Sequence, residues 1–215
     1  MGEQREAAGT GRRGRPTAET SRLKLAHLLE VARDQFAAHG FRAVTMRKVA
    51  DIAQVSTRTL YDHYSDKLSL FRACLDSGSV DFPPIIHDPE VEVAVALRVY
   101  AALLVRMLSS DASLRISMVV SREGGEFPEL VRSADAVQHK YLMVPLAAFM
   151  RDAGLARDDG ESRAKLFVAL ALAEWQRRYV FLHPFPQGQE IEDHAEQAVD
   201  LFLKGAIQTV GETDE

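Results

Sequence analysis

The sequence predicts an all-α protein of about nine helices, divided into a small N-terminal unit with a helix-turn-helix and a larger helical C-terminal unit. Two observations support this prediction. Apolar residues recur three and four positions apart along most of the chain, and prolines and glycines gather in short segments between these stretches. The chain has 215 residues, of which 47% are hydrophobic, so it is long enough to bury a core in each unit.

The net charge of −5 is distributed unevenly along the chain. Residues 1–80 contain 13 Lys and Arg against 9 Asp and Glu, whereas residues 81–215 contain 13 against 22. Binding to nucleic-acid phosphates requires a positive surface, and an acidic remainder stays away from them. The charge pattern therefore favours nucleic-acid binding by the N-terminal unit.

Residues 1–20 are expected to form a disordered basic arm, because glycines and arginines alternate there and no apolar segment can pack. The sequence from Arg13 to Pro16 resembles the core of an AT-hook. In such a motif, Arg13 and Arg15 would lie in the narrow minor groove of A·T-rich DNA. A flexible solubilising tail is the alternative interpretation.

Residues 21–80 are expected to form the helix-turn-helix domain. Ser21 is the predicted N-cap of a first helix that runs to about His39, and Gly40 is expected to end it in the αL conformation. A fourth helix is expected from Asp66 to Gly78. Between them lie two short helices that share an apolar seam, made of Met46, Val49, Ala50, Ala53, Val55, Leu60 and Tyr64. Two short helices cannot bury this seam alone, so we expect it to pack against the first helix.

The other face of the second short helix carries side chains that suit nucleic acid. Six residues point away from the seam or lie at its edges: Thr57, Arg58, Thr59, Tyr61, Asp62 and His63. Hydroxyl, guanidinium, imidazole and phenol groups contact phosphates and base edges when a helix enters the major groove. This helix is therefore predicted to be a recognition helix.

The run from LLEVARDQF to FRACL, residues 28–75, resembles the DNA-binding domain of the tetracycline-repressor (TetR) family of transcriptional regulators. The resemblance is continuous from the first helix to the fourth. It implies that Thr45 caps the second helix. It also implies that nine residues lie at or near DNA: Thr45, Arg47, Thr57, Arg58, Thr59, Tyr61, His63, Tyr64 and Lys67.

Two residues depart from the pattern of that family. Gln54 stands where the turn generally has Gly, and a positive φ at this position would cost roughly 1 kcal/mol. Arg58 stands where a Gly is common. We expect this long side chain to influence the choice of operator sequence.

Residues 81–215 are predicted to form the C-terminal unit, since three prolines between residues 83 and 89 interrupt helical structure. Its helices are expected at about 90–108, 114–122, 128–153, 161–182 and 190–209. The segment LRISMVVSREGGEFPEL, residues 114–130, is similar to the ligand domain of a multidrug-regulator-like branch of the same family. This resemblance implies a ligand-binding and dimerisation domain.

Methionines and aromatic residues in this unit suggest a binding site for a lipophilic molecule. The candidate ligand-binding residues are Met107, Met118, Met143, Phe149, Trp175 and Tyr179. Such side chains adapt to varied apolar guests, but at helical spacing they can equally form ordinary core. Polar anchors could come from Arg98, Arg122, Glu174 and Arg177.

The last two predicted helices, residues 161–182 and 190–209, have wide apolar faces. The resemblance implies that they pair with their copies across a two-fold axis to form a four-helix bundle. A symmetric dimer would also match a palindromic operator in double-stranded DNA. The alternative is that these faces are core within one chain.

The sequence contains no pattern that indicates an enzyme, a cofactor or a metal site. Its seven histidines lack a partner at ligand spacing, and its single cysteine, Cys74, suits a reducing compartment. Residues 1–20 do not resemble a signal peptide, and no apolar run has membrane length, so we expect a cytoplasmic protein that does not bind membranes.

We therefore predict a homodimeric DNA-binding transcriptional regulator that acts as a repressor. An unknown small lipophilic effector is expected to release it from its palindromic operator. Two alternatives stay open. One is an effector-independent architectural DNA-binding protein, and the other is a helical enzyme.

Overall fold

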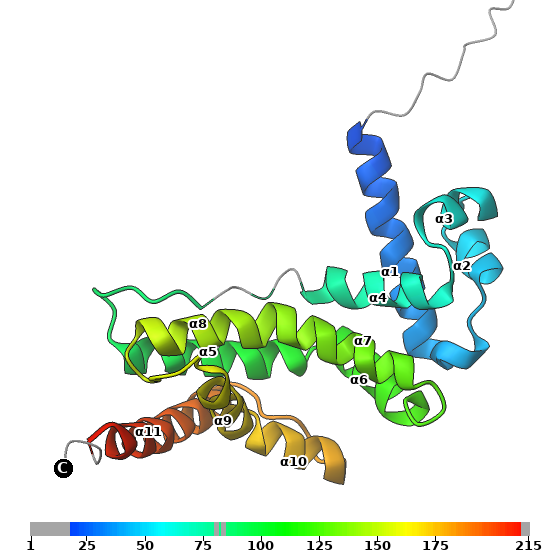
Figure 1. The fold of residues 1–215 in the computed structure, drawn as a ribbon. Helices are drawn as coiled ribbons and strands as arrows, with labels where there is room; N and C mark the ends of the chain where they lie inside the picture. Colours follow the sequence, from blue (N-terminus) through cyan, green and yellow to red (C-terminus); the bar gives the residue numbers. More distant parts are fainter. Residues whose placement is uncertain (1–17, 80–81, 83–84, 212–215) are drawn as a thin grey trace, which may run out of the picture.

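The computed structural model describes residues 18–79, 82 and 85–211, and every regular element in these residues is helical (Figure 1). It contains eleven α-helices and one π-helical turn. The helices α7 and α8 are continuous through this turn, and a single residue separates α9 from α10. When each of these pairs is counted as one rod, the described residues form nine rods, which confirms the prediction of an all-α fold with about nine helices.

The N-terminal unit, residues 18–79, contains four helices: α1 (Ala18–Ala43), α2 (Met46–Ile52), α3 (Thr57–His63) and α4 (Lys67–Ser79). In Figure 1, α2 and α3 lie beside α1, and α4 crosses α1 near its C-terminal end. The helix α1 begins before Ser21, so the prediction that Ser21 caps it is wrong. A polar residue at a plausible distance from an apolar stripe does not by itself fix where a helix starts.

Gly40 interrupts α1 near its end, with φ 80° and ψ 166°. This positive φ confirms the predicted break at Gly40, because glycine adopts it without strain. The predicted αL conformation is wrong, since ψ lies far outside the αL region. The chain resumes for one helical turn over residues 41–43. The contacts of that turn are described below.

Short side chains cap the three helices that follow α1. In each case the side-chain oxygen accepts a hydrogen bond from the backbone N–H three residues later: Thr45 Oγ1 from Lys48 (3.2 Å), Ser56 Oγ from Thr59 (3.0 Å) and Asp66 Oδ1 from Ser69 (2.7 Å). Such caps satisfy N–H groups that a helix leaves without partners. The caps fix where α2, α3 and α4 begin.

The core of the N-terminal unit extends into the rest of the protein. Leu28, Ala32 and Phe36 of α1 are fully buried, and they pack with the seam of α2 and α3. The same cluster includes Ile116, Val119 and Leu130 from the C-terminal unit. The two units therefore share one apolar cluster at their junction.

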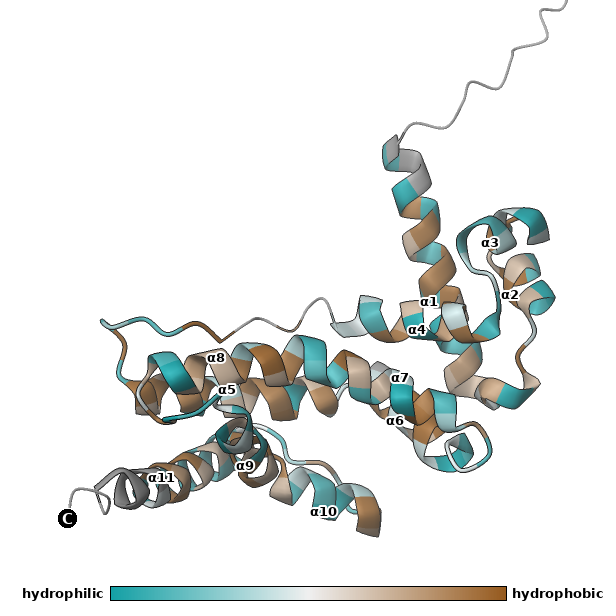
Figure 2. Ribbon diagram, in the orientation of Figure 1, coloured by the Kyte–Doolittle hydropathy of each residue, from teal (hydrophilic) through white to brown (hydrophobic). Residues whose placement is uncertain are grey.

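The C-terminal unit, residues 85–211, is built on the central helix α5. Its elements are α5 (Val93–Leu108), α6 (Asp111–Glu123), α7 (Pro128–Gln138), η1 (His139–Met143), α8 (Val144–Asp152), α9 (Glu161–Ala171), α10 (Ala173–Phe181) and α11 (Gln189–Gly211). Figure 2 shows α5 as hydrophobic over most of its length. Leu97, Ala101 and Leu104 of α5 are completely buried, which fits its central place.

The π-helical turn η1 lies in the middle of the long helix predicted at 128–153. Pro145 follows this turn. A proline inside a helix lacks an N–H group, and its ring collides with the carbonyl group four residues earlier. The wider π turn makes room for the ring, so the rod continues to Asp152 without a break.

The helix predicted at 161–182 is divided at Leu172, which has φ −101° and ψ 2°. The ring of His194 on α11 explains how the break is tolerated. Its Nε2 lies 3.1 Å from the carbonyl oxygens of both Leu170 and Ala171. His194, from a distant helix, thus contacts the carbonyl groups at the break. The sequence pattern of residues 161–182 alone could not reveal this partner.

Gln54, in the turn between α2 and α3, has φ 56°, as expected if it replaces a glycine. We predict that Gln54→Gly raises the free energy of unfolding by about 1 kcal/mol relative to Gln54→Ala, because glycine adopts this φ without strain. Both variants lose the same exposed side chain, so Gln54→Ala is the matched control. Urea denaturation measures the difference, and equal stabilities would show that the turn stores no strain.

Candidate nucleic-acid interface

The helix α3 buries one residue and exposes the rest of its surface. Leu60 is fully buried, whereas six residues are exposed: Thr57, Arg58, Thr59, Tyr61, Asp62 and His63. These are the residues that the sequence placed on the outer face. Tyr61 is 51% exposed although it is aromatic, so a large ring faces solvent beside a guanidinium group and two hydroxyl groups. This surface offers both donors and a flat apolar ring to a partner.

The N-terminal end of α2 adds further polar groups near this surface. Thr45 and Arg47 are exposed, as is the neighbouring Lys48. Tyr64, at the end of α3, is half-buried and packs against the core of the N-terminal unit. Burial raises the pKa of its phenol, so the hydroxyl stays protonated at neutral pH. Its role in the fold is to close α3 against the core.

Lys67 has an internal partner in addition to its predicted place near DNA. Its Nζ donates to the carbonyl oxygens of Phe41 (2.6 Å) and Arg42 (3.2 Å), and it lies 4.4 Å from the centre of the Phe41 ring. Partial burial lowers the pKa of this ammonium group, and the charge of Glu123 acts in the opposite direction. Lys67 therefore helps to hold the turn at residues 41–43.

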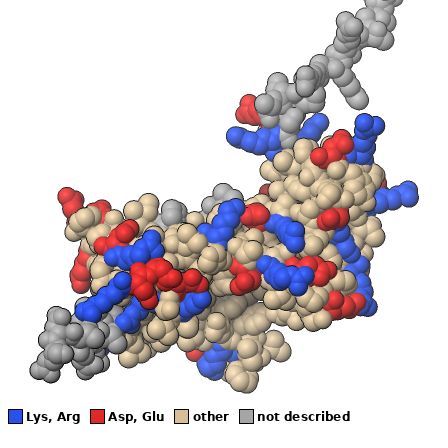
Figure 3. Space-filling view, viewed as in Figure 1, with Lys and Arg blue, Asp and Glu red and all other residues tan. Residues whose placement is uncertain are grey.

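The side of the molecule that contains α2 and α3 carries Lys and Arg along its outer edge, whereas acidic and basic groups mix over the C-terminal unit (Figure 3). This distribution agrees with the uneven charge of the sequence. Arg13 and Arg15, the proposed minor-groove residues, lie outside the residues that the structure describes.

Glu123, at the C-terminal end of α6, connects the two units. Its Oε1 accepts a hydrogen bond from the N–H group of Phe41 (3.0 Å), and its Oε2 accepts one from that of Arg42 (2.7 Å). A carboxylate that receives two N–H groups in this way acts as a helix cap supplied by another helix. We call these hydrogen bonds of Glu123 and Lys67 to the backbone of Phe41 and Arg42 the turn clamp.

Aromatic rings surround the residue at the centre of the turn clamp. The ring of Phe41 lies 5.9 Å from Phe36, 5.6 Å from Phe71 and 5.3 Å from Phe127. These neighbours come from α1, α4 and the loop before α7. Arg42 forms an ion pair with Glu126 and lies 5.9 Å from the Phe127 ring. The turn is therefore fixed by apolar packing as well as by charge.

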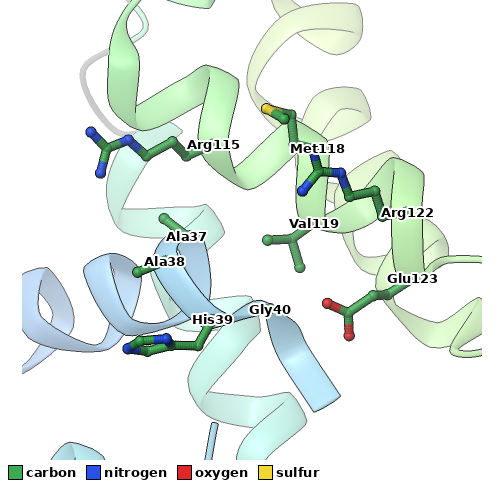
Figure 4. Close-up of a pocket in the computed structure, with 9 residues that line it drawn as sticks. All are labelled: Ala37, Ala38, His39, Gly40, Arg115, Met118, Val119, Arg122 and Glu123. Atoms are coloured by element: carbon green, nitrogen blue, oxygen red, sulfur yellow. The ribbon is translucent and has the colours of Figure 1, made fainter. Parts of the chain in front are cut away.

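The six candidate ligand-binding residues do not come together around one described cavity. Met143, Phe149 and Trp175 are buried in the core of the C-terminal unit, and Met107 and Tyr179 are half-buried. Met118 instead lines a cavity of about 430 Å³ between α1 and α6 (Figure 4). Met118 therefore lines a cavity, whereas Met143, Phe149 and Trp175 belong to the core.

Three of the proposed polar anchors are already paired. Glu174 accepts hydrogen bonds from Arg177 and Arg178, and these bonds lower the pKa of its carboxyl group to about 2. Arg98 forms ion pairs with Asp200 and Glu196 of α11. The pairs of Arg98 join α5 to α11, whereas those of Glu174 with Arg177 and Arg178 lie within α10. Arg122, the fourth, lines the cavity between α1 and α6.

Trp175 and Tyr179 of α10 form an aromatic stack with Phe185, which lies between α10 and α11. The Trp175 ring lies 5.3 Å from that of Tyr179 and 5.7 Å from that of Phe185, and the planes are inclined by 9° and 26°. The Nε1 of Trp175 is buried and has no hydrogen-bond partner within the described part of the chain. A buried donor of this kind favours a partner that brings an acceptor.

Large apolar side chains are exposed on α9, α10 and α11. Leu166 of α9 is 56% exposed and Leu201 of α11 is 63% exposed. Val180, Phe181 and Leu182, at the end of α10, are exposed as well. Exposed apolar side chains of this size, on helices that contact one another, make these helices a candidate interaction surface.

Within residues 18–79, 82 and 85–211, no group of three or more His, Cys, Asp or Glu is arranged to hold a metal ion. In the same residues no single helix is both long and apolar enough to cross a membrane. Only α5 and residues 113–123 of α6, which meet at an angle of 69°, reach that length and composition together.

Comparison with protein families gives two matches that together span most of the chain. Residues 28–74 match the family described as "Bacterial regulatory proteins, tetR family". Residues 95–205, more than half of the chain, match "AefR-like transcriptional repressor, C-terminal domain". No curated protein sequence matches this chain.

Solved structures with a similar fold include a flavonoid-responsive regulator, FrrA, with a TM-score of 0.72 at 24% identity, which covers 86% of this chain and 97% of that one. A TetR-family regulator from Mesorhizobium loti has a TM-score of 0.71 at 21% identity, with the same coverage of both chains. Another, from Pseudomonas syringae pv. tomato, has a TM-score of 0.66 at 23% identity and covers 84% of this chain and 95% of that one. At these identities, the likeness concerns the fold.

We predict that Glu123→Gln lowers the free energy of unfolding by about 1.5–3 kcal/mol, because a neutral amide replaces a carboxylate that receives two hydrogen bonds. Glu126→Gln is the control. It removes a charge three residues further along the chain, but the ion pair of Glu126 with Arg42 is exposed, so its loss should cost about 0–1 kcal/mol. Chemical denaturation compares the variants. Equal losses would mean that the turn clamp contributes nothing beyond ordinary surface charge.

Proposed function

Because the chain belongs to the TetR family of transcriptional regulators, and is thus a DNA-binding regulator, we propose that it acts as a homodimeric repressor. In this proposal the dimer binds a palindromic operator, and a small lipophilic effector bound to the C-terminal unit releases it. The observation that carries the proposal is the exposure of α3: only Leu60 of this helix is buried, and its other six residues face solvent.

The outer face of α3 supports direct contact with bases. Arg58 is exposed at the second position of the helix, where its guanidinium group can donate two hydrogen bonds to a guanine edge. The exposed hydroxyl groups of Thr57 and Thr59 suit phosphates, and the ring of Tyr61 suits a thymine methyl group. We assign base reading to Arg58 and positioning on the backbone to Thr45, Arg47 and Thr57.

Dimerisation through α9, α10 and α11 is supported by the apolar side chains that these helices expose. Leu166 and Leu201 lie on helices that pack against each other within the chain, and their side chains are more than half exposed. Burying such residues between two copies would bring free energy that the isolated chain does not gain. A two-fold dimer would also place two copies of α3 on successive major grooves.

The aromatic stack of α10 supports a planar aromatic effector. Trp175 stacks with the rings of Tyr179 and Phe185, and its buried Nε1 is available to a hydrogen-bond acceptor on a ligand. FrrA, whose fold is similar, is named for its response to flavonoids, which are molecules of this kind. We therefore propose a flat aromatic molecule with at least one acceptor oxygen as the effector.

Release from DNA requires that the effector bind one conformer better than the other. Contacts between α1 and α6 and between α4 and α7 join the units, and the turn clamp is part of the first set. An effector that moves α6 therefore also moves the end of α1. Because α2 and α3 pack on α1, this motion changes the spacing of the two recognition helices.

We predict that Arg58→Ala weakens binding to the preferred operator by about 1–3 kcal/mol and leaves binding to scrambled DNA nearly unchanged. The operator is selected from random DNA by the wild-type protein, and competitive gel shifts give both affinities. Arg132→Ala removes an exposed arginine of α7 and is the matched control. Unchanged operator binding by Arg58→Ala, or an equal loss on both DNAs, would contradict base reading.

We also predict that Leu201→Glu converts the dimer into a monomer and weakens operator binding at least tenfold, because an unpaired charge in an apolar interface is strongly unfavourable. Val99→Glu is the control, since Val99 of α5 is exposed to the same extent, 63%, outside the proposed interface. Analytical ultracentrifugation measures the masses. A dimer that persists in Leu201→Glu would place the interface elsewhere.

A further inference from the structure

We propose that the cavity between α1 and α6 is a binding site for an amphipathic organic anion, distinct from the effector site proposed at Trp175. The cavity lies where the C-terminal part of α1 faces α6 (Figure 4). Its volume is about 430 Å³. Sites for small organic molecules have volumes of roughly 300–1,000 Å³, so this cavity can hold a molecule of one or two rings.

One part of the cavity lining is apolar. Ala37 and Ala38 contribute short side chains from α1, which leave space between the two helices. Met118 and Val119 contribute larger side chains from α6, and Figure 4 shows these two pairs on opposite sides of the cavity. Methionine adapts its shape to a guest. This lining suits the hydrophobic body of the molecule.

The charged part of the lining is positive. Arg115 and Arg122, both from α6, carry this charge, which does not depend on the protonation of the exposed ring of His39 from α1. The carboxylate of Glu123 is the acidic group of the lining, and both of its oxygens already accept hydrogen bonds from the turn at residues 41–43. The guanidinium group of Arg122 can therefore bind a carboxylate on the guest through two parallel hydrogen bonds.

A second cavity, of about 360 Å³, lies between α4 and α7 and also has a basic lining. Two of its cations contact partners within the chain. Lys140 forms an ion pair with Asp76 at 3.3 Å, and Arg72 donates to the hydroxyl group of Ser133 at 2.9 Å. Arg132 completes that lining and provides a test that separates the two sites.

A molecule bound in the cavity between α1 and α6 would affect the turn clamp, because the two sites share residues. Gly40 and Glu123 line the cavity and also belong to the contact between α1 and α6. A guest that binds Arg122 brings its own negative charge next to Glu123. The like charges repel, so the guest favours conformers in which Glu123 has moved away from the turn. This effect on DNA binding rests on the proposed function, whereas binding itself does not.

The test is isothermal titration calorimetry of the full-length protein, without DNA, with 1-naphthoate as probe. Two neutral or cationic analogues of the same shape, 1-naphthalenemethanol and 1-naphthylmethylamine, are the ligand controls. We expect 1-naphthoate to bind at least tenfold more tightly than either. No binding of 1-naphthoate at millimolar concentration, or equal binding of the alcohol, would overturn the proposal.

Variants then locate the site. Arg122→Glu should weaken 1-naphthoate binding at least tenfold, and Ala38→Phe, which fills the cavity from an exposed position of α1, should abolish it. The second variant decides the question if the first does not fold. Arg132→Glu should bind as the wild type does. A loss in Arg132→Glu would assign the anion to the cavity between α4 and α7, and a loss in Trp175→Phe would assign it to the effector site.

The outcome is independent of the DNA-binding experiments. If 1-naphthoate does not bind but Arg58→Ala loses operator specificity, this inference fails and the proposed function stands. If both hold, gel shifts with added 1-naphthoate should show weaker operator binding for the wild type and no change for Ala38→Phe.

Discussion

The backbone of Phe41 and Arg42 is held from two sides, and the relation between the two units depends on this arrangement. Glu123 of α6 receives both N–H groups, and Lys67 of α4 donates to both carbonyl oxygens. Hydrogen bonds to charged groups contribute more than neutral ones, and groups deprived of a partner near a core are costly. Two helices thus converge on one turn, so the end of α1 cannot move unless α4 or α6 follows it.

The glycine at position 40 is what allows this contact. A Cβ atom at Gly40 would lie 2.0 Å from Oε1 of Glu123, and φ at this position is 80°. The backbone conformation therefore requires glycine, and a side chain here would also displace the carboxylate of Glu123. The close approach also places the carboxylate directly above the next two N–H groups, as a capping side chain would be placed. A sequence signal for a helix end, Gly followed by Phe, turns out to mark a connection between units.

Local patterns in the sequence predicted most of the fold, and contacts between distant residues explain the rest. The seam of α2 and α3 and the exposed face around Arg58 follow from residues within one or two helical turns, whereas the positive φ of Gln54 was expected from the family resemblance. The cap from Glu123 joins residues 82 positions apart, and the ring of His194 satisfies carbonyl groups 24 and 23 positions away. No periodicity records such partners. For the same reason, spacing alone could not separate Met118, which lines a cavity, from Met143, which is core.

The free energy of the hydrogen bonds in the turn clamp is comparable to the coupling free energy that an allosteric effect requires. A ligand that changes DNA affinity a hundredfold needs a coupling free energy of about 2.7 kcal/mol. Each hydrogen bond to a charged group is worth about 1.5–3 kcal/mol, so the two bonds to Glu123 are sufficient to carry such a coupling. The shared apolar cluster, with Ile116 and Val119 of α6 packed into the core of the N-terminal unit, keeps the units in contact while these bonds change. A small displacement of α6 can therefore redirect α3 without opening the junction, because packed interfaces shift between discrete arrangements and do not deform continuously.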